Sequence, residues 1–256
     1  APDIVAFSTT TPSQKMDMEL AKLIKRANQD IYIIMGGPHP TFYPQTIEEN
    51  DQLDAICIGE GEFALLEFVE NIGNRARLQT IKNLWIKDGQ NIYKNGVRDL
   101  VKNLDELPVF DYRLYFDKYL ALANLPTKIF IAGRGCPFPC SYCFKKQSME
   151  IYERKGSYVR YKSPDKLIEE IQSMRSEFSM EWVQFGDDIF GINRSWLTEF
   201  LEKYKIKIGL PFLCNLQPNM ISEDLIIQLK DAGVDRVDFG IECGNEKFRK
   251  TILNRN

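Results

Sequence analysis

The chain has 256 residues, of which 44% are hydrophobic and 27% are charged, the composition of an ordinary globular protein. Its 33 Lys and Arg against 36 Asp and Glu give a net charge of −3, so we expect no nucleic-acid partner, because such proteins carry a basic excess. No apolar run approaches the ~20 residues that cross a bilayer, and we expect no membrane span. The first residues show no secretion-signal pattern, which favours the cytoplasm.

Short apolar runs alternate with helical patterns in the first part of the chain. The runs that predict buried strands lie at 4–7, 31–35 and 55–58. The segments that predict helices lie at 14–28, around 45–50, and from about 62 to 72. On the first and third of these helices, the apolar residues expected to face inward are Met16, Leu20, Leu23, Ile24 and Ala27, and Phe63, Leu66, Val69 and Ile72. This alternation implies parallel pairing in an open α/β sheet.

The alternation of strands and helices stops over residues 79–127. This stretch contains a predicted hairpin that turns at Asp88–Gly89 and an aromatic segment that we expect to pack as a linker. The alternation resumes at residue 128, and Ser163 followed by Pro164 predicts the start of a helix. The predicted strands of this second series lie at 129–132, 182–185, 211–214 and 237–241. Four such units predict a partial (β/α) barrel.

We therefore expect three parts, an α/β domain of the Rossmann type at 1–78, a hairpin and linker at 79–127, and a partial barrel at 128–256. The chain starts directly on a strand-like run, and four barrel units would leave an open sheet edge. We therefore expect both domains to be incomplete and the whole protein to extend in both directions.

The strongest chemical signal is a cluster of three cysteines, Cys136, Cys140 and Cys143, which follows the predicted strand at 129–132. Barrel enzymes carry their chemistry on loops at the carboxyl ends of their strands. The spacing C-x3-C-x2-C lets one loop hold three thiolates around one side of a metal centre, and three thiolates leave one iron of a four-iron cube without a protein ligand. The sequence therefore predicts an iron–sulfur site with an open coordination position.

A structural zinc site is the alternative, with a fourth ligand from His39, Cys57, Cys214 or Cys243. Zinc sites built from cysteines usually consist of two closely spaced pairs. Because this chain has no second pair, we favour the iron–sulfur centre.

The cysteine loop, with the aromatic Tyr142 before its last cysteine, resembles the signature of radical S-adenosylmethionine (SAM) enzymes. The resemblance covers about residues 128–256. It implies that the three cysteines hold a 4Fe-4S cluster whose fourth iron binds SAM, and that Tyr142 lies near the adenine. It also implies that the reduced cluster cleaves SAM to a 5′-deoxyadenosyl radical, with electrons from a donor of the flavodoxin or ferredoxin type.

Two further stretches carry the resemblance. Gly186, Asp187 and Asp188 follow the second barrel strand, where the family has a motif that meets the SAM amino group; the alternative is that the two aspartates cap the next helix. Glu242 lies in a stretch similar to the family's GIESG, which implies contact with the ribose hydroxyls or the amino group of SAM, against the alternative of a structural ion pair. Weaker candidates at the end of the third strand are Asn215 and Gln217.

The first part of the chain resembles the cobalamin-binding domain of one large radical SAM class. The resemblance implies that a nucleotide tail is contacted by Ser8, Thr9, Gly36 and Gly37. Small hydroxyl residues and a glycine pair after parallel strands suit a crevice at the carboxyl edge of the sheet. The family's strand and loop that face the corrin would lie upstream of residue 1, and some relatives keep this domain without using cobalamin. We expect His39 to be a plain loop residue.

The leading hypothesis is a cobalamin-dependent radical SAM enzyme that methylates an unactivated carbon of a small-molecule or peptide substrate. Its expected cofactors are a 4Fe-4S cluster, SAM and cobalamin. One alternative is a radical SAM cyclase or rearrangement enzyme that transfers no methyl group. The other is a non-catalytic module that binds cobalamin or a metal.

Overall fold

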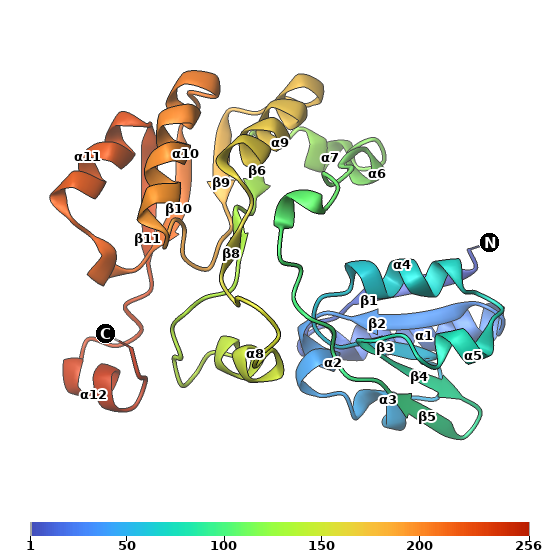
Figure 1. Cartoon of the computed structure of the whole chain (residues 1–256). Helices are drawn as coiled ribbons and strands as arrows, with labels where there is room; N and C mark the ends of the chain where they lie inside the picture. Colours follow the sequence, from blue (N-terminus) through green and yellow to red (C-terminus); the bar gives the residue numbers. More distant parts are fainter. Residues whose placement is uncertain (1, 256) are drawn as a thin grey trace. The chain divides into compact units, whose positions relative to one another are not determined.

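The computed structural model describes residues 2–255, and the contacts within the chain divide it into two units (Figure 1). The first unit comprises Ala1–Leu100 and Gln147–Gly156, and the second comprises Val101–Lys146 and Ser157–Asn256. Each unit has its own sheet and its own buried core. The domain limits predicted after residues 78 and 127 stay predictions.

The first unit is built on a five-stranded sheet in the order β1-β2-β3-β4-β5. Its strands are β1 (Ile4–Ser8), β2 (Tyr32–Gly36), β3 (Ala55–Cys57), β4 (Leu84–Asp88) and β5 (Asn91–Lys94). β1, β2 and β3 are parallel, as predicted, and the predicted hairpin adds β4 and β5 as an antiparallel edge. β1 lies at the other edge, so its residues are half-buried or exposed instead of buried as expected.

Helices connect these strands, but most of the residues predicted to face inward on two of them do not, although Ile24 does pack against the core. The helices are α1 (Gln14–Ala27), α2 (Pro38–Phe42), α3 (Thr46–Glu49), α4 (Glu62–Glu70) and α5 (Arg75–Leu78). In α1 the buried apolar residues are Met18 and Ala21, and in α4 they are Ala64 and Phe68. The exposed ones include Met16, Leu20, Leu23, Phe63, Leu66, Val69 and Ile72. Both helices carry apolar residues on two faces, so periodicity alone did not determine which face meets the sheet.

The second unit has a four-stranded parallel sheet in the order β11-β10-β9-β6, the first four strands of the predicted barrel. Its strands are β6 (Thr127–Phe130), β9 (Trp182–Phe185), β10 (Phe212–Leu216) and β11 (Val234–Phe239). The remaining strands, β7 (Gly133–Arg134) and β8 (Arg160–Tyr161), form a small antiparallel pair.

Three long helices pack on this sheet, α9 (Pro164–Glu177), α10 (Arg194–Lys207) and α11 (Glu223–Asp231) (Figure 1). As predicted, α9 begins at Pro164 with Ser163 as its cap, because the Ser163 hydroxyl accepts the Lys166 N–H at 3.1 Å. The shorter helical segments are η1 (Leu104–Glu106), α6 (Arg113–Phe116), α7 (Leu120–Ala123), α8 (Lys145–Ile151), η2 (Pro218–Met220) and α12 (Glu246–Thr251).

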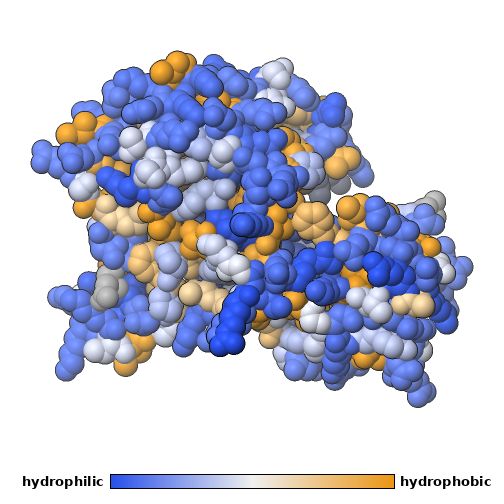
Figure 2. Space-filling model, in the orientation of Figure 1, coloured by the Kyte–Doolittle hydropathy of each residue, from blue (hydrophilic) through white to orange (hydrophobic). Residues whose placement is uncertain are grey.

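Aromatic side chains fill the core between this sheet and its helices. The rings of Phe185 and Phe190 stack with their centroids 4.3 Å apart, and those of Trp196 and Phe200 stack at 5.2 Å. Such pairs add to the stabilisation from burial alone. The face of the molecule in Figure 2 is mostly hydrophilic, with scattered apolar groups. Over residues 2–255, we find no helix with the length and hydropathy of a bilayer-crossing segment.

The segment Gln147–Gly156 packs in the first unit through Tyr152. The Glu60 N–H donates a hydrogen bond of 2.7 Å to the Tyr152 hydroxyl, and Tyr152 is 5% exposed. The hydroxyl lies over Gly59, whose φ is +77°, so that a Cβ atom there would overlap it. Only glycine fits this position.

We expect Gly59→Ala to destabilise the protein by about 2 kcal/mol, because the methyl group displaces Tyr152 and the residue must also hold a positive φ. Gly89→Ala is the matched control, since Gly89 has a φ of +61° but no atom within 4 Å of the place that a methyl group would take. Urea unfolding of both variants measures the difference, and equal losses would show that Tyr152 does not constrain this site.

Candidate functional site

The cysteine loop starts where β6 ends and is held close to β8. A Cβ atom on Gly133 would lie 2.6 Å from the Arg160 carbonyl oxygen. Gly135 has a φ of +89°, and a Cβ atom there would overlap the Tyr158 carbonyl oxygen. The two glycines therefore permit a contact between backbones that no other residue allows.

The three cysteines line one pocket of about 380 Å³ in the second unit. Cys136 and Cys140 are buried and Cys143 is half-buried, and all three are free thiols. Burial raises the pKa of the Cys136 thiol, and the neighbouring Asp188, Cys140 and Cys143 raise it further, while a backbone hydrogen bond opposes them. The loop thus gathers three sulfur donors around one space.

The described residues of this pocket do not converge on one point as the ligands of a single ion would. Within residues 2–255, no group of three His, Cys, Asp or Glu side chains converges closely enough to hold one ion. The described pocket lining contains neither Cys214, Cys243 nor any histidine that could complete a zinc site. A four-iron cube, in contrast, binds each thiolate at a separate iron, so its ligands stand apart.

Neighbouring strand ends bring carboxylates and an amide to the same pocket. Its lining includes Asp188 after β9, Asn215 in β10, and Asp238 and Glu242 at and after the end of β11. The carboxyl ends of parallel strands meet at one edge of a sheet, which explains this gathering. Glu242 has a φ of +62°, an uncommon conformation for a residue with a side chain and one that recurs at functional sites.

Of the residues predicted to bind SAM, Tyr142, Asp188, Glu242 and Asn215 line the pocket of the cysteines. The other candidates, Gly186, Asp187 and Gln217, are not part of its lining. The Gly186 N–H instead donates to the Phe130 carbonyl at 2.8 Å, at the end of the β6–β9 ladder.

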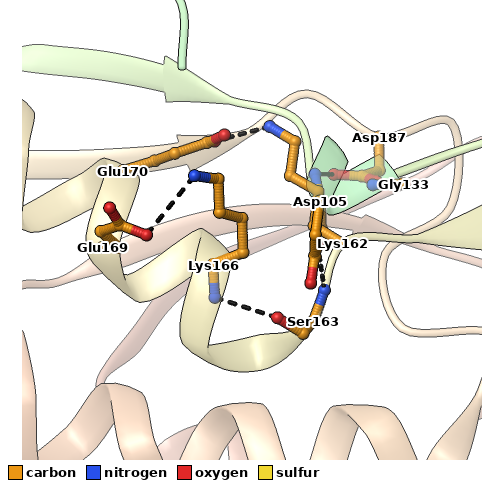
Figure 3. Close-up of polar contacts among 9 residues, drawn as sticks. Asp105, Gly133, Lys162, Ser163, Lys166, Glu169, Glu170 and Asp187 are labelled. Atoms are coloured by element: carbon orange, nitrogen blue, oxygen red, sulfur yellow. Dashed lines mark hydrogen bonds and ion pairs between the residues drawn. The ribbon is translucent and has the colours of Figure 1, made fainter. Parts of the chain in front are cut away.

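The carboxylate of Asp187 is buried, lies beside Gly133 (Figure 3) and accepts two backbone hydrogen bonds. They come from the N–H groups of Ala132 at 2.9 Å and Gly133 at 2.7 Å. The alternative that Asp187 and Asp188 cap the next helix is wrong, because the cap of α10 is Asn193, whose side chain accepts the Trp196 N–H.

Sequence reasoning missed two cations at the pocket, Lys145 and Arg255. The Lys145 ammonium lies 2.7 Å from the Asp188 carboxylate. The Arg255 guanidinium donates to the Tyr142 hydroxyl at 3.1 Å and to the Gly240 carbonyl at 2.7 Å, and it lies 3.8 Å from the Cys140 sulfur. Lys145 lies two residues after the last cysteine, which is a usable signal, whereas Arg255 is 113 residues from Tyr142 and has none.

A second candidate site lies at the carboxyl edge of the first sheet, where β1 and β2 bring Ser8, Thr9, Gly36 and Gly37 together. Ser8 pairs with Gly36 in register, and the Thr9 N–H donates to the Gly36 carbonyl at 2.8 Å. Gly37 has a φ of +92°, and a Cβ atom on it would lie 2.8 Å from the Thr9 nitrogen. The four residues predicted to contact a nucleotide tail are therefore neighbours.

Two buried polar atoms at this edge of the sheet lack a hydrogen-bond partner among the described residues, the Thr9 hydroxyl oxygen and the His39 Nε2. His39 lies in the short helix α2 and is buried, so the expectation of a plain loop residue is wrong. Its Nδ1 lies 3.2 Å from the Thr11 hydroxyl, and burial lowers its pKa, which favours a neutral ring. Buried polar atoms normally have partners, so these two suit a polar ligand.

Burial raises the pKa of Asp187 from 3.8 to about 6, although its amide hydrogen bonds lower it. The folded chain then holds the proton more tightly than the unfolded chain. This contribution to stability is therefore complete below pH 3.8 and is lost as the pH rises through 6. We expect the stability of the wild type to fall by about 3 kcal/mol relative to Asp187→Asn between acid and neutral pH. Urea unfolding of both proteins across this pH range measures the difference in stability. Curves of stability against pH that run parallel for the two proteins would contradict the prediction.

Two family models match the chain, the B12 binding domain over residues 1–69 and the radical SAM superfamily over residues 130–256. An uncharacterized methyltransferase of Pyrococcus horikoshii is 30% identical and covers 98% of this chain and 54% of its own length. The anaerobic magnesium-protoporphyrin IX monomethyl ester cyclase of Rubrivivax gelatinosus is 28% identical, and the match covers 94% of this chain and 44% of the cyclase. The chain thus spans about half the length of these curated relatives.

Solved structures share the fold. The cobalamin-dependent SAM radical enzyme OxsB with aqua-cobalamin and SAM bound has a TM-score of 0.76 at 20% identity, covering 100% of this chain and 37% of its own. The radical SAM methyltransferase TsrM from Kitasatospora setae, with cobalamin and a [4Fe-4S] cluster bound, has a TM-score of 0.74 at 16% identity. The match covers 98% of this chain and 50% of TsrM.

Proposed function

Since the chain belongs to the radical SAM superfamily and carries an N-terminal B12-binding domain, we propose that it acts as a cobalamin-dependent methyltransferase on an unactivated carbon. The main support is the pocket of the second unit, in which three free cysteines meet carboxylates from neighbouring strand ends. The name of a relative, the uncharacterized methyltransferase of Pyrococcus horikoshii, agrees with this reaction class.

The pocket suits a 4Fe-4S cluster held by Cys136, Cys140 and Cys143. The donors are thiols, they share one space, and no further cysteine or histidine among the described lining residues would close the fourth position. When bound, the cluster supplies the electron that cleaves SAM to a 5′-deoxyadenosyl radical. Binding must displace the thiol protons, so the raised pKa of Cys136 makes loading more favourable at higher pH.

The charged groups of the pocket suit the polar ends of SAM. The carboxylates of Asp188 and Glu242 offer partners for an ammonium, and Glu242 also offers an acceptor for ribose hydroxyls. The Arg255 guanidinium offers donors for a carboxylate, and Tyr142 offers an aromatic face for the adenine. In the SAM-free chain Lys145 neutralises Asp188, and an incoming ammonium would compete with it.

The carboxyl edge of the sheet in the first unit suits the nucleotide tail of cobalamin. Gly36 and Gly37 present backbone without side chains, and the buried Thr9 hydroxyl and His39 Nε2 offer hydrogen bonds that no described protein group satisfies. Bound cobalamin would supply the methyl group to be transferred. Thr9, Ser8 and His39 then act by binding and orienting it.

The expected substrate is a small molecule or peptide, and the expected electron donor is a flavodoxin- or ferredoxin-type protein in the cytoplasm. A second candidate function is ring formation without methyl transfer, which the 28% identity to the Rubrivivax cyclase favours. The products formed from SAM distinguish these two functions. Methyl transfer yields S-adenosylhomocysteine beside 5′-deoxyadenosine, whereas cyclisation yields 5′-deoxyadenosine alone.

We expect Cys140→Ala to lose the cluster and SAM cleavage, to less than about a tenth of wild type, because one of three ligands is missing. The full chain is reconstituted anaerobically with iron and sulfide and reduced, and iron, absorbance and 5′-deoxyadenosine are measured. Cys57→Ala is the control, since Cys57 is buried in the first unit and should leave both intact. A cluster that survives in Cys140→Ala would contradict the ligand assignment, and bound zinc without iron would favour a non-catalytic module.

We expect Thr9→Val to weaken cobalamin binding about fivefold to tenfold, because it removes one hydrogen bond, without lowering the stability of the cobalamin-free chain. The hydroxyl has no described partner there, and valine has the same shape. Titration with cobalamin, followed by protein fluorescence, gives the affinity. Thr198→Val on α10, in the second unit, is the control. Equal affinities for wild type and Thr9→Val would exclude Thr9 as a contact.

A further inference from the structure

The sheet of the second unit stops providing backbone partners just before the cysteine loop begins. The last rung between β9 and β6 runs from the Gly186 N–H to the Phe130 carbonyl. Ala132, two residues further on, has no exposed surface. A buried amide without a partner costs as much free energy as a lost hydrogen bond, so this segment needs another acceptor.

Asp187 provides that acceptor, one residue beyond the rung. Its Oδ2 accepts the Ala132 N–H at 2.9 Å. Its Oδ1 accepts the Gly133 N–H at 2.7 Å, and Figure 3 shows Asp187 beside Gly133. Both oxygens of the carboxylate therefore serve the backbone. The neighbouring Asp188, in contrast, lines the pocket of the cysteines and is partly exposed.

The same two residues are held from the opposite side by the segment around β8. The Ala132 carbonyl accepts the Lys162 N–H at 2.9 Å, and Gly133 pairs with Tyr161. The Lys162 carbonyl in turn accepts the Trp196 indole N–H at 2.7 Å, so this contact is anchored in the core. Cys136 follows Gly133 by three residues. The start of the cysteine loop is thus hydrogen-bonded both to Asp187 after β9 and to the segment around β8.

We propose that Asp187 is a positioning residue that fixes the start of the cysteine loop, and thereby the place of Cys136. The inference rests on the proposed function, because it takes the loop to hold the cluster. Two amide donors require two acceptor oxygens. Asparagine has one acceptor, and its amide group would oppose the second donor.

The first test uses hydrogen exchange of the metal-free full chain. We expect the amides of Ala132 and Gly133 to be protected in the wild type and to exchange at least about tenfold faster in Asp187→Asn, while α10 stays protected. Asp188→Asn is the matched control and should exchange like the wild type. Equal protection of these amides in the wild type and in Asp187→Asn would overturn the proposal. If the variant does not fold, unprotected amides in the wild type would overturn it as well.

The second test measures cluster loading and SAM affinity separately after anaerobic reconstitution. We expect Asp187→Asn to hold at least about threefold less iron and to show an altered EPR spectrum when reduced, while its loaded fraction binds SAM within about twofold of the wild type. Asp188→Asn should load fully and bind SAM at least about tenfold more weakly. The reverse pattern would make Asp187 the ligand. A wild-type chain that takes up no cluster contradicts the proposed function and leaves the exchange result standing.

Discussion

Parallel pairing of β6, β9, β10 and β11 determines where the candidate site of the second unit lies. In such a sheet all carboxyl ends meet at one edge, so loops that are distant in the sequence contribute to one pocket. The backbone beyond each strand loses its sheet partners at that edge. The Asp187 carboxylate replaces those partners for Ala132 and Gly133, which ties the end of the sheet to the start of the cysteine loop.

The first unit uses the same principle with different residues. Its parallel strands β1 and β2 end at Ser8 and Gly36, and the chain then crosses Thr9 so closely that Gly37 admits no side chain. Each unit therefore has a candidate site at the carboxyl edge of its parallel strands, where glycines let one backbone approach another. The chemistry differs, with hydroxyls and a neutral ring in one and thiols and carboxylates in the other.

The sequence was sufficient for features that depend on neighbouring residues. The parallel strands, the hairpin at Gly89, the start of α9 and the three-cysteine loop are all local patterns. It was insufficient where the outcome depends on distant packing. The buried faces of α1 and α4 followed from contact with the sheet, and the role of Asp187 followed from where β6 loses its rung. The contact between Arg255 and Tyr142 leaves no pattern in the sequence.

The return of Gln147–Gly156 to the first unit limits how this protein can be divided for study. Tyr152 covers Gly59 and accepts the Glu60 N–H, yet it comes from the chain that follows the last cysteine. A recombinant B12-binding domain ended near Leu100 would uncover Gly59 and remove the acceptor of the Glu60 N–H. Domain boundaries chosen from sequence alone would therefore give a poorly behaved fragment, and a fusion that restores the tyrosine segment would be the sounder design.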